Sequence, residues 1–245
     1  MNAQILSVEI RDELYAIIRE PAAVFFSILM PVGFFALFAS LYGNLPSEGI
    51  STGTTMLALF GTFGVVGVTL LSPGIGVAED RERGWLRVKR VSPVPVGTTL
   101  LAKVAATVPV AFAVFAAMSL TAMALGSFDT ALGTWLRLAA VLLVGSLPFA
   151  LLGLAAGFVT SGRVAPALLN AVFIPMVVAS GLWMPLETLP AFVQRIAPLL
   201  PTYHLAQWGM GVLLGEAVLD HVGALLATTA VAAVLAAVAY RSSRM

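Results

Sequence analysis

Six long apolar segments, whose central parts carry no acidic, basic or histidine side chain, set the strongest constraint on the fold. They occupy residues 22–42, 54–78, 104–125, 134–159, 164–184 and 221–240. Each is close to the ~20 residues that a helix needs to cross a bilayer, where a helix also pairs its own backbone polar groups. Only 10% of all residues are charged, against about a quarter in soluble domains. We therefore expect an all-α integral membrane protein with six transmembrane helices.

Basic residues are distributed unevenly between the two sides of these segments. Eleven of the thirteen Lys and Arg residues fall on the side of the N-terminus, and only Arg137 and Arg195 fall on the other side. Short cytoplasmic loops of membrane proteins carry an excess of Lys and Arg. We therefore expect a multi-pass protein of the cell membrane, plasma or inner, with both its N- and C-termini in the cytoplasm.

Residues 4–20 have the periodicity of a helix but are too charged and too short to span. Leu6, Ile10, Leu14 and Ile17 follow one another at steps of four, four and three, which places them on one apolar stripe. The other faces carry acidic and basic side chains. Such a helix is expected to lie in the plane of the cytoplasmic membrane surface.

The segment 185–215 is apolar but does not read as a span, because prolines interrupt it repeatedly. These are Pro185, Pro190, Pro198 and Pro201. Two short helices that dip into the outer leaflet would explain both properties, with Trp183 and Trp208 as aromatic anchors at the interface. We expect a re-entrant outer hairpin before the last span.

Small residues recur where transmembrane helices can touch. Gly153 and Gly157 have the small-xxx-small spacing that lets two helix backbones approach closely. Gly61, Gly64 and Gly67 repeat every three residues in the second apolar segment. The alternative is that glycine is simply more frequent in membrane helices.

A charged segment, 79–103, separates the second and third spans and holds six of the thirteen Lys and Arg residues. Trp85 lies among these bases, and the acids Glu79 and Asp80 precede it. An apolar patch beside basic side chains suits docking of a cytoplasmic protein, and the prolines at 93 and 95 end the short helix there. A basic loop that only meets lipid headgroups is the alternative, and it accounts poorly for the tryptophan and the acids.

The chain lacks an energy source and a catalytic motif of its own. Ionisable groups inside spans usually mark proton-driven carriers, and the span centres have none. There is no HExxH, GxSxG or paired-Asp motif within a span, no GxxxxGK[ST], and no cysteine. The two histidines, His204 and His221, are expected to be interfacial polar side chains. We therefore expect a protein that is not an enzyme, binds no cofactor or metal, and is powered by a separate ATPase.

Three motifs carry a resemblance to a known family. Residues 79–84 read EDRERG and are followed by LRVKRVSPVP at 86–95 and by Lys103. Residues 180–190 read SGLWMPLETLP, and residues 198–204 read PLLPTYH. In order and spacing the chain resembles the permease subunits of ABC-2 type transporters, which include the daunorubicin-resistance-like multidrug exporters.

This resemblance implies a single ABC-2 type transmembrane domain over 1–245, with 4–20 as the connecting helix, 79–103 as the coupling loop and 185–215 as the re-entrant segment. It implies two cytoplasmic ABC ATPase subunits that hold ATP and Mg²⁺, and a second permease that is identical or homologous. The residues that would contact the ATPase are Arg83, Gly84, Trp85, Leu86, Arg87, Val88, Lys89 and Arg90, with Arg163 of the turn 160–163 as a secondary contact.

Aromatic side chains of the first two spans suggest a route for cargo. Phe34, Phe38, Phe60 and Phe63 could line an apolar cleft, and Asn170 is the strongest side-chain dipole within a span. The alternative is that these rings pack against neighbouring helices or lipid. Such a cleft suits a hydrophobic or amphipathic cargo, such as a drug or lipid-like molecule.

Two other functions remain open from the sequence. One is a sodium-coupled or ATP-independent carrier, since broken helices can coordinate Na⁺ through backbone carbonyls. The other is a membrane scaffold that recruits a cytoplasmic partner without transporting anything.

Overall fold

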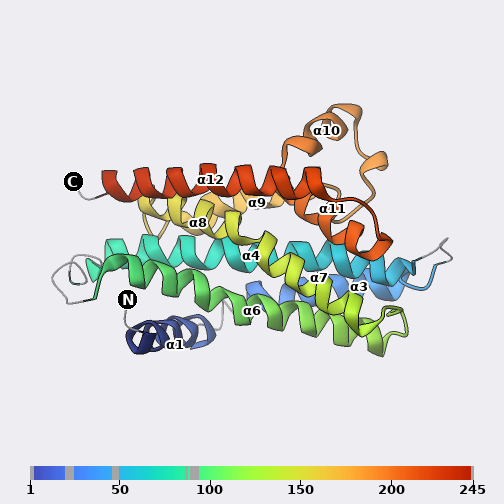
Figure 1. The fold of residues 1–245 in the computed structure, drawn as a ribbon, viewed down its shortest axis with the longest axis horizontal. Coiled ribbons are helices and arrows are strands. Elements are labelled where there is room, and N and C mark those ends of the chain that lie inside the picture. The colour runs from blue at the N-terminus through green and yellow to red at the C-terminus, as the bar shows by residue number, and fades with distance from the viewer. Residues whose placement is uncertain (1–2, 20–24, 46–49, 86–87, 89–93, 244–245) are drawn as a thin grey trace.

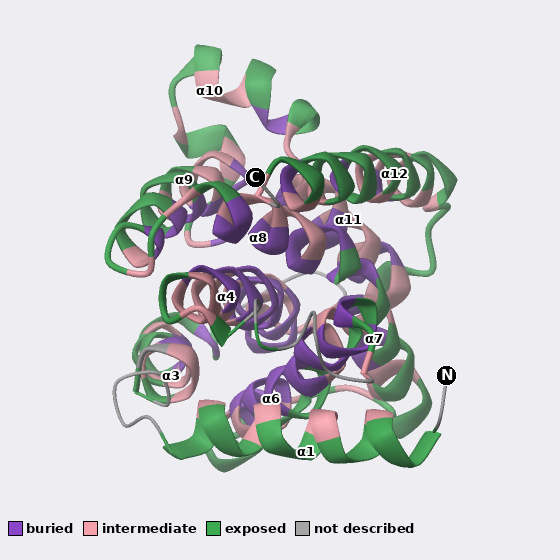
Figure 2. Cartoon of the chain, turned by 90° about the vertical axis from the view of Figure 1, so that its left-hand side faces the viewer, coloured by how far each residue is buried: buried purple, intermediate pink, exposed green. Residues whose placement is uncertain are grey.

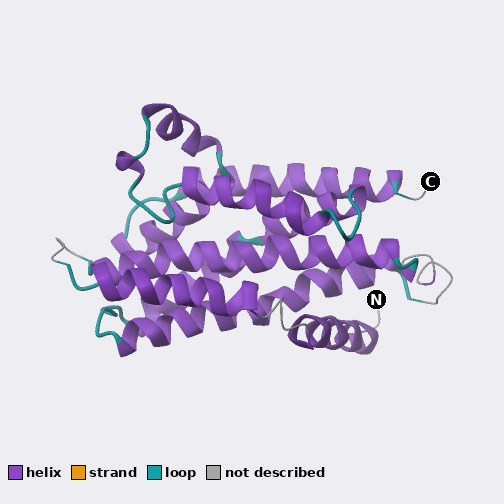
Figure 3. Ribbon diagram, turned by 180° about the vertical axis from the view of Figure 1, so that it is seen from behind, coloured by secondary structure: helices purple, strands orange, loops and turns teal. Residues whose placement is uncertain are grey.

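We describe the fold from a computed structural model of the chain. The description covers residues 3–19, 25–45, 50–85, 88 and 94–243. Within this part of the chain the regular structure is entirely helical, as Figure 3 shows. The predicted all-α class is therefore confirmed.

The helices form an elongated bundle (Figure 1). Their bounds are α1 Ala3–Arg19, η1 Phe25–Leu29, α3 Met30–Tyr42, α4 Thr52–Glu82, α6 Val96–Ala124, α7 Leu132–Gly145, α8 Leu147–Val159, α9 Ala165–Ala179, η2 Leu186–Thr188, α10 Ala191–Ile196, η3 Ala197–Leu199, α11 Pro201–Leu214 and α12 Leu219–Ser242. The C-terminal turns of α4, α8 and α12 and the start of α6 lie at one end of the bundle, together with α1. We call this the α1 end.

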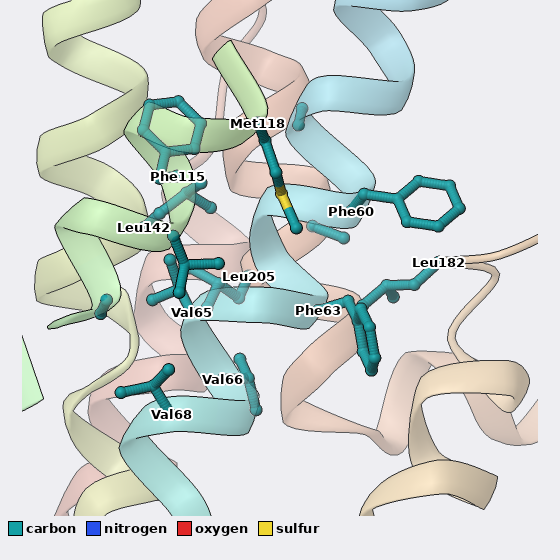
Figure 4. Packing of buried hydrophobic residues seen from close by; sticks show 14 of the residues in the cluster. Phe60, Phe63, Val65, Val66, Val68, Phe115, Met118, Leu142, Leu182 and Leu205 are labelled. Carbon is teal, nitrogen blue, oxygen red and sulfur yellow. The ribbon is translucent and has the colours of Figure 1, made fainter. Parts of the chain in front are cut away.

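Helix α4 is the centre of the packing. It contacts α3, α6, α8, α9 and α11, and 72% of its most apolar stretch is buried, against 22% for α12 at the periphery. Side chains from every face of α4 enter the core. Figure 4 shows Phe63 beside Leu182 on one side of this helix and Phe115 and Leu142 on the other. In Figure 2 the buried residues accordingly gather around α4 and α8.

Four helices of the described chain are long and apolar enough to cross a membrane: Thr52–Glu82, Val96–Ala124, Leu132–Val159 and Leu219–Ser242. They correspond to the predicted second, third, fourth and sixth spans. The predicted first and fifth spans contain shorter apolar helices, Ser27–Tyr42 and Ala165–Ala179. An integral membrane bundle is therefore supported, and the total of six crossings stays a prediction.

Two of the predicted boundaries differ from the structure. The charged segment 79–103 is helical at both ends, because α4 continues to Glu82 and α6 already begins after Pro95. Lys103 therefore lies inside α6. The predicted span 134–159 is interrupted at Ser146, which ends α7, and Pro148 then stands in the first turn of α8. Proline fits a first helical turn because its missing N–H has no partner there anyway.

The outer segment 185–215 contains α10 and α11, which behave differently. Helix α10 has no buried residue and stands off the bundle (Figures 1 and 2). Helix α11 packs against α4, α7 and α12 and buries Leu205 and Ala206. Two α-helices are present in this segment, and a re-entrant hairpin in the outer leaflet stays a prediction.

The glycine spacing in α8 produces a backbone contact with α4. A Cβ atom on Gly153 would collide with the carbonyl oxygen of Leu70, and one on Gly157 would collide with that of Gly74. The close approach predicted from the small-xxx-small spacing is therefore confirmed. It fixes α8 directly against the central helix.

We expect Gly153→Ala to lower the free energy of unfolding by about 1–3 kcal/mol, since backbone atoms must move to admit the methyl group. Gly223→Ala in α12 is the matched control, because an added Cβ there meets nothing within 4 Å. Thermal unfolding of both variants in the same detergent measures the difference. Equal melting temperatures for the two variants would contradict the backbone contact.

Candidate coupling site and transport path

Three charged side chains from three helices meet at the α1 end. The Nζ atom of Lys103, on α6, lies 2.8 Å from Glu13 Oε2 on α1 and 2.7 Å from Asp80 Oδ2 on α4. The lysine side chain is only 6% exposed, and the two carboxylates are 20% and 19% exposed. We call these three residues the charge cluster. It joins the first helix of the chain to the central helix through a single ammonium group.

Burial makes this cluster energetically demanding. A buried ammonium group needs partners that replace its hydration, and removing one partner of a buried pair destabilises a protein by about 3–5 kcal/mol. Burial raises the pKa of Glu13 above its usual value, and the attraction to Lys103 opposes this rise without cancelling it. Glu13 therefore binds a proton more readily than a carboxyl group in water does.

The face of α1 that holds the cluster is the predicted apolar stripe. Leu14 and Ile17 pack against the core, and Thr99 Oγ1 of α6 donates a hydrogen bond to Glu9 Oε2 at 3.1 Å. Sequence reasoning missed the two glutamates on this stripe. Their positions, three residues after Leu6 and Ile10, are the signal that could have found them.

The last turn of α4 also binds the end of α8. Arg81 Nη1 donates hydrogen bonds to the carbonyl oxygens of Phe158 and, at 3.3 Å, of Gly157. These carbonyls belong to the C-terminal turn of α8, where a cation is favoured. Glu82 Oε2 accepts a hydrogen bond from the backbone N–H of Gly162 at 2.8 Å. The end of α4 is thereby tied to α1, α6, α8 and the turn at 160–163.

The predicted ATPase-contacting residues follow directly after the last turn of α4. Arg83 is exposed and forms an ion pair with Glu79 at 3.2 Å. Gly84 has φ +75°, a left-handed conformation that favours glycine and turns the chain away from α4. Trp85 and Val88 are 46% and 53% exposed.

The other predicted contacts divide in two. Leu86, Arg87, Lys89 and Arg90 lie outside the described residues, so their part in an ATPase contact stays a prediction. Arg163 is exposed and directly follows Gly162, whose N–H binds Glu82. The structure thus places the turn 160–163 beside the C-terminal end of α4, which leads into the other predicted ATPase contacts.

Two of the predicted cargo-path aromatics, Phe34 and Phe63, contact Trp183, while Phe38 and Phe60 contact each other. Ring centroids are 5.7 Å apart for Phe34 and Trp183, 5.2 Å for Phe63 and Trp183, and 5.4 Å for Phe38 and Phe60. Phe60 and Phe63 are buried in the core, whereas Phe34 is 37% exposed. The indole N–H of Trp183 is buried and has no hydrogen-bond acceptor within the described residues. Sequence reasoning treated Trp183 only as an interfacial anchor.

Asn170 is not part of this aromatic group. It lies on the exposed side of α9, and its side-chain amide donates a hydrogen bond to the carbonyl of Pro166 at 2.8 Å. A polar side chain in an apolar helix commonly satisfies itself in this local way. The structure therefore does not bring Asn170 together with the phenylalanines.

Comparison with known proteins identifies the family of the chain. Residues 5–214 match the family described as "ABC-2 type transporter", from the first turn of α1 to the last residue of α11. The chain is also similar to the protein named "Putative transport permease YvfS" of Bacillus subtilis (strain 168), with 25% identity over 202 residues, which is 78% of each chain. Together with its apolar helices, these matches identify a membrane transport permease. The chain belongs to the ABC-2 type transporter family.

Proposed function

We propose that this permease is the transmembrane subunit of an ATP-driven exporter, and that a separate cytoplasmic ABC ATPase binds it at residues 83–90. This proposal rests on the contacts that fix the C-terminal end of α4 to its neighbours. Ionic and hydrogen-bonded contacts tie that end to three other helices, and the exposed Trp85 follows three residues later. A force applied at the exposed segment therefore acts on the central helix and its neighbours together.

The packing suggests how such a force would spread. Helix α4 runs without interruption through 31 residues, with Pro73 inside it as a point where it can bend. The backbone contact with Gly153 and Gly157 obliges α8 to follow α4. Pro148 at the start of α8 and Pro175 inside α9 are further bending points. We infer that ATP-driven movement of the partner rotates these helices as stiff elements.

The chemistry of hydrolysis belongs to the partner. In this proposal ATP and Mg²⁺ are held by the ATPase subunit, and the permease supplies only the docking segment and the moving helices. Helix α1 and the C-terminal end of α12 lie at the same end of the bundle as the C-terminal turn of α4, which precedes the docking segment (Figure 1). This placement supports a cytoplasmic location for both termini in the cell membrane.

A hydrophobic or amphipathic cargo fits the aromatic group around Trp183. Phe34 is partly exposed on α3, next to the exposed apolar side chains of Leu37 and Leu41. The group is therefore open on one side of the chain. We propose that a second permease, identical or homologous, covers that side, so that the cargo path runs between the two chains while membrane lipid covers the remaining apolar surface.

The docking segment is tested by the triple change Arg83→Ala, Gly84→Ala and Trp85→Ala. We expect the variant to insert into the membrane but to lose both co-purification with its ATPase and cargo-stimulated ATP hydrolysis. The matched control changes Phe192 and Arg195 to Ala, an exposed aromatic and an exposed Arg on α10. Transport that survives the triple change, or transport that persists without any ATPase, contradicts the proposal.

The charge cluster is tested by comparing three variants. Lys103→Met leaves two carboxylates without their cation, and we expect it to lower the free energy of unfolding by about 3 kcal/mol. Glu13→Gln keeps an amide oxygen that can accept a hydrogen bond from Lys103 and leaves Asp80 as the counter-ion, so a smaller loss of about 1–2 kcal/mol is expected. Chemical unfolding in detergent gives both values. An equal loss in the two variants argues against Lys103 as the centre of the cluster.

The third variant separates an effect on stability from an effect on the coupling of ATP hydrolysis to transport. Lys103→Met combined with Asp80→Asn removes one charge of each sign and should recover part of the stability lost in the single change. We expect this double variant to keep its ATPase bound and hydrolysing ATP while transporting several-fold less cargo per ATP, because α1 is no longer tied to α4. Transport per ATP at the wild-type level would show that the cluster serves stability alone.

The cargo path is tested at α3. We expect Phe34→Ala to raise several-fold the cargo concentration that gives half-maximal stimulation of ATP hydrolysis, since a ring stacked on Trp183 is lost. Leu226→Ala, at an exposed apolar side chain of α12, serves as the control and should leave this concentration unchanged. The same response in both variants assigns Phe34 to the general apolar surface instead.

A further inference from the structure

The two histidines of the chain meet at the start of the last helix. His204 lies in the first turn of α11 and His221 in the first turn of α12. Their Nδ1 atoms are 3.0 Å apart, and their ring centroids are 5.3 Å apart. Tyr203 packs edge-on against both rings. Both imidazoles are half-buried, so their shared edge is reachable from solvent.

A backbone carbonyl fixes which nitrogen of His204 is protonated. The Nε2 atom of His204 lies 2.8 Å from the carbonyl oxygen of Pro198. A carbonyl oxygen can only accept, so Nε2 must carry the hydrogen and donate it. In the neutral ring the lone pair is then on Nδ1, and that lone pair faces Nδ1 of His221.

The 3.0 Å separation suits a hydrogen bond between the two rings, and it is also a separation that two imidazole ligands of a single metal ion adopt. Metal–nitrogen bonds of about 2.0–2.1 Å separate two such nitrogens by about 2.9–3.4 Å at ordinary ligand angles. A metal-binding histidine also commonly donates its other N–H to a backbone carbonyl, which orients the ring. His204 satisfies both conditions. His221 meets the distance condition. Its Nδ1 atom has a free lone pair when the ring is neutral and Nε2 carries the hydrogen.

We propose that His204 and His221 bind one divalent late first-row transition-metal ion, of the class Cu²⁺, Ni²⁺ or Zn²⁺. Within the described residues no group of three or more His, Asp or Glu side chains surrounds a metal position. The protein therefore supplies two ligands, and water fills the rest. Such a site is reversible, and among these ions it prefers Cu²⁺. This proposal does not depend on the ATPase or the cargo.

The bound ion joins the first turns of two consecutive helices. Helix α11 continues the outer segment that carries α10, while α12 is the last helix of the bundle, and Figure 1 shows their first turns beside each other below α10. A metal ion between the first turns restrains the outer segment against α12. The site is thus an attachment of the outer segment that depends on a metal ion.

The composition of the chain makes the test direct. The chain has two His and no Cys, so no other imidazole or thiol competes for the metal. The full-length protein is purified in detergent without a polyhistidine tag. Zinc chloride at about 100 times the dissociation constant should raise the melting temperature by about 5 °C, and a chelator should reverse this. The electron paramagnetic resonance spectrum of bound Cu²⁺ should show coupling to two imidazole nitrogens.

Variants and pH supply the controls. His204→Gln and His221→Gln should each abolish the zinc-dependent shift, whereas Asp220→Asn, an exposed neighbour, should keep it. In the unmodified protein the shift should be much smaller at pH 5 than at pH 7.5, because protons compete for the imidazoles. A plain hydrogen bond between the two rings predicts no metal-dependent shift at either pH. That result, or a shift that survives both histidine changes, overturns the proposal.

Discussion

The ammonium group of Lys103 between Glu13 and Asp80 is the contact on which the α1 end depends. A lysine that is 6% exposed cannot give up its carboxylates without leaving an unpaired charge in an apolar surrounding. Helix α1 is amphipathic and has no buried residue of its own, so apolar packing alone holds it weakly. The charge cluster therefore converts a peripheral helix into a part of the bundle.

Because α4 lies at the centre of the bundle, this attachment affects several helices. Its last turn contacts α1, α6 and α8 through charged groups, while its middle contacts α8 through the glycines and α9 through the stack of Phe63 on Phe173. Its first turn is held differently, by neutral hydrogen bonds such as Ser51 Oγ to the carbonyl of Ser127 at 3.2 Å. Helix α4 thus runs from an end that is held by neutral hydrogen bonds to an end that is held by charged side chains.

Local sequence patterns predicted the parts of the fold that local physics determines. The spacing of Leu14 and Ile17 predicted the apolar stripe of α1, which packs against the bundle, and Gly153 with Gly157 predicted a close helix contact. The charge cluster was missed because its members are up to 90 residues apart, and nothing local indicates that Lys103 is buried. Asn170 forms a short local hydrogen bond on the exposed side of α9, and its part in a cargo path stays a prediction. The pairing of His204 with His221 arises only because α11 returns along α12.

The difference in packing between the α1 end and the outer segment indicates which part of the molecule moves. At the α1 end, a displacement of α4 must break buried ionic contacts or carry α1, α6 and α8 with it, and carrying them requires less free energy. Beyond the bundle, α10 buries none of its residues and Phe192 is 67% exposed. Segments with few buried contacts open at low free energy. A force that enters at the α1 end is therefore transmitted stiffly there, and its largest displacement is expected in the outer segment, where little packing resists it.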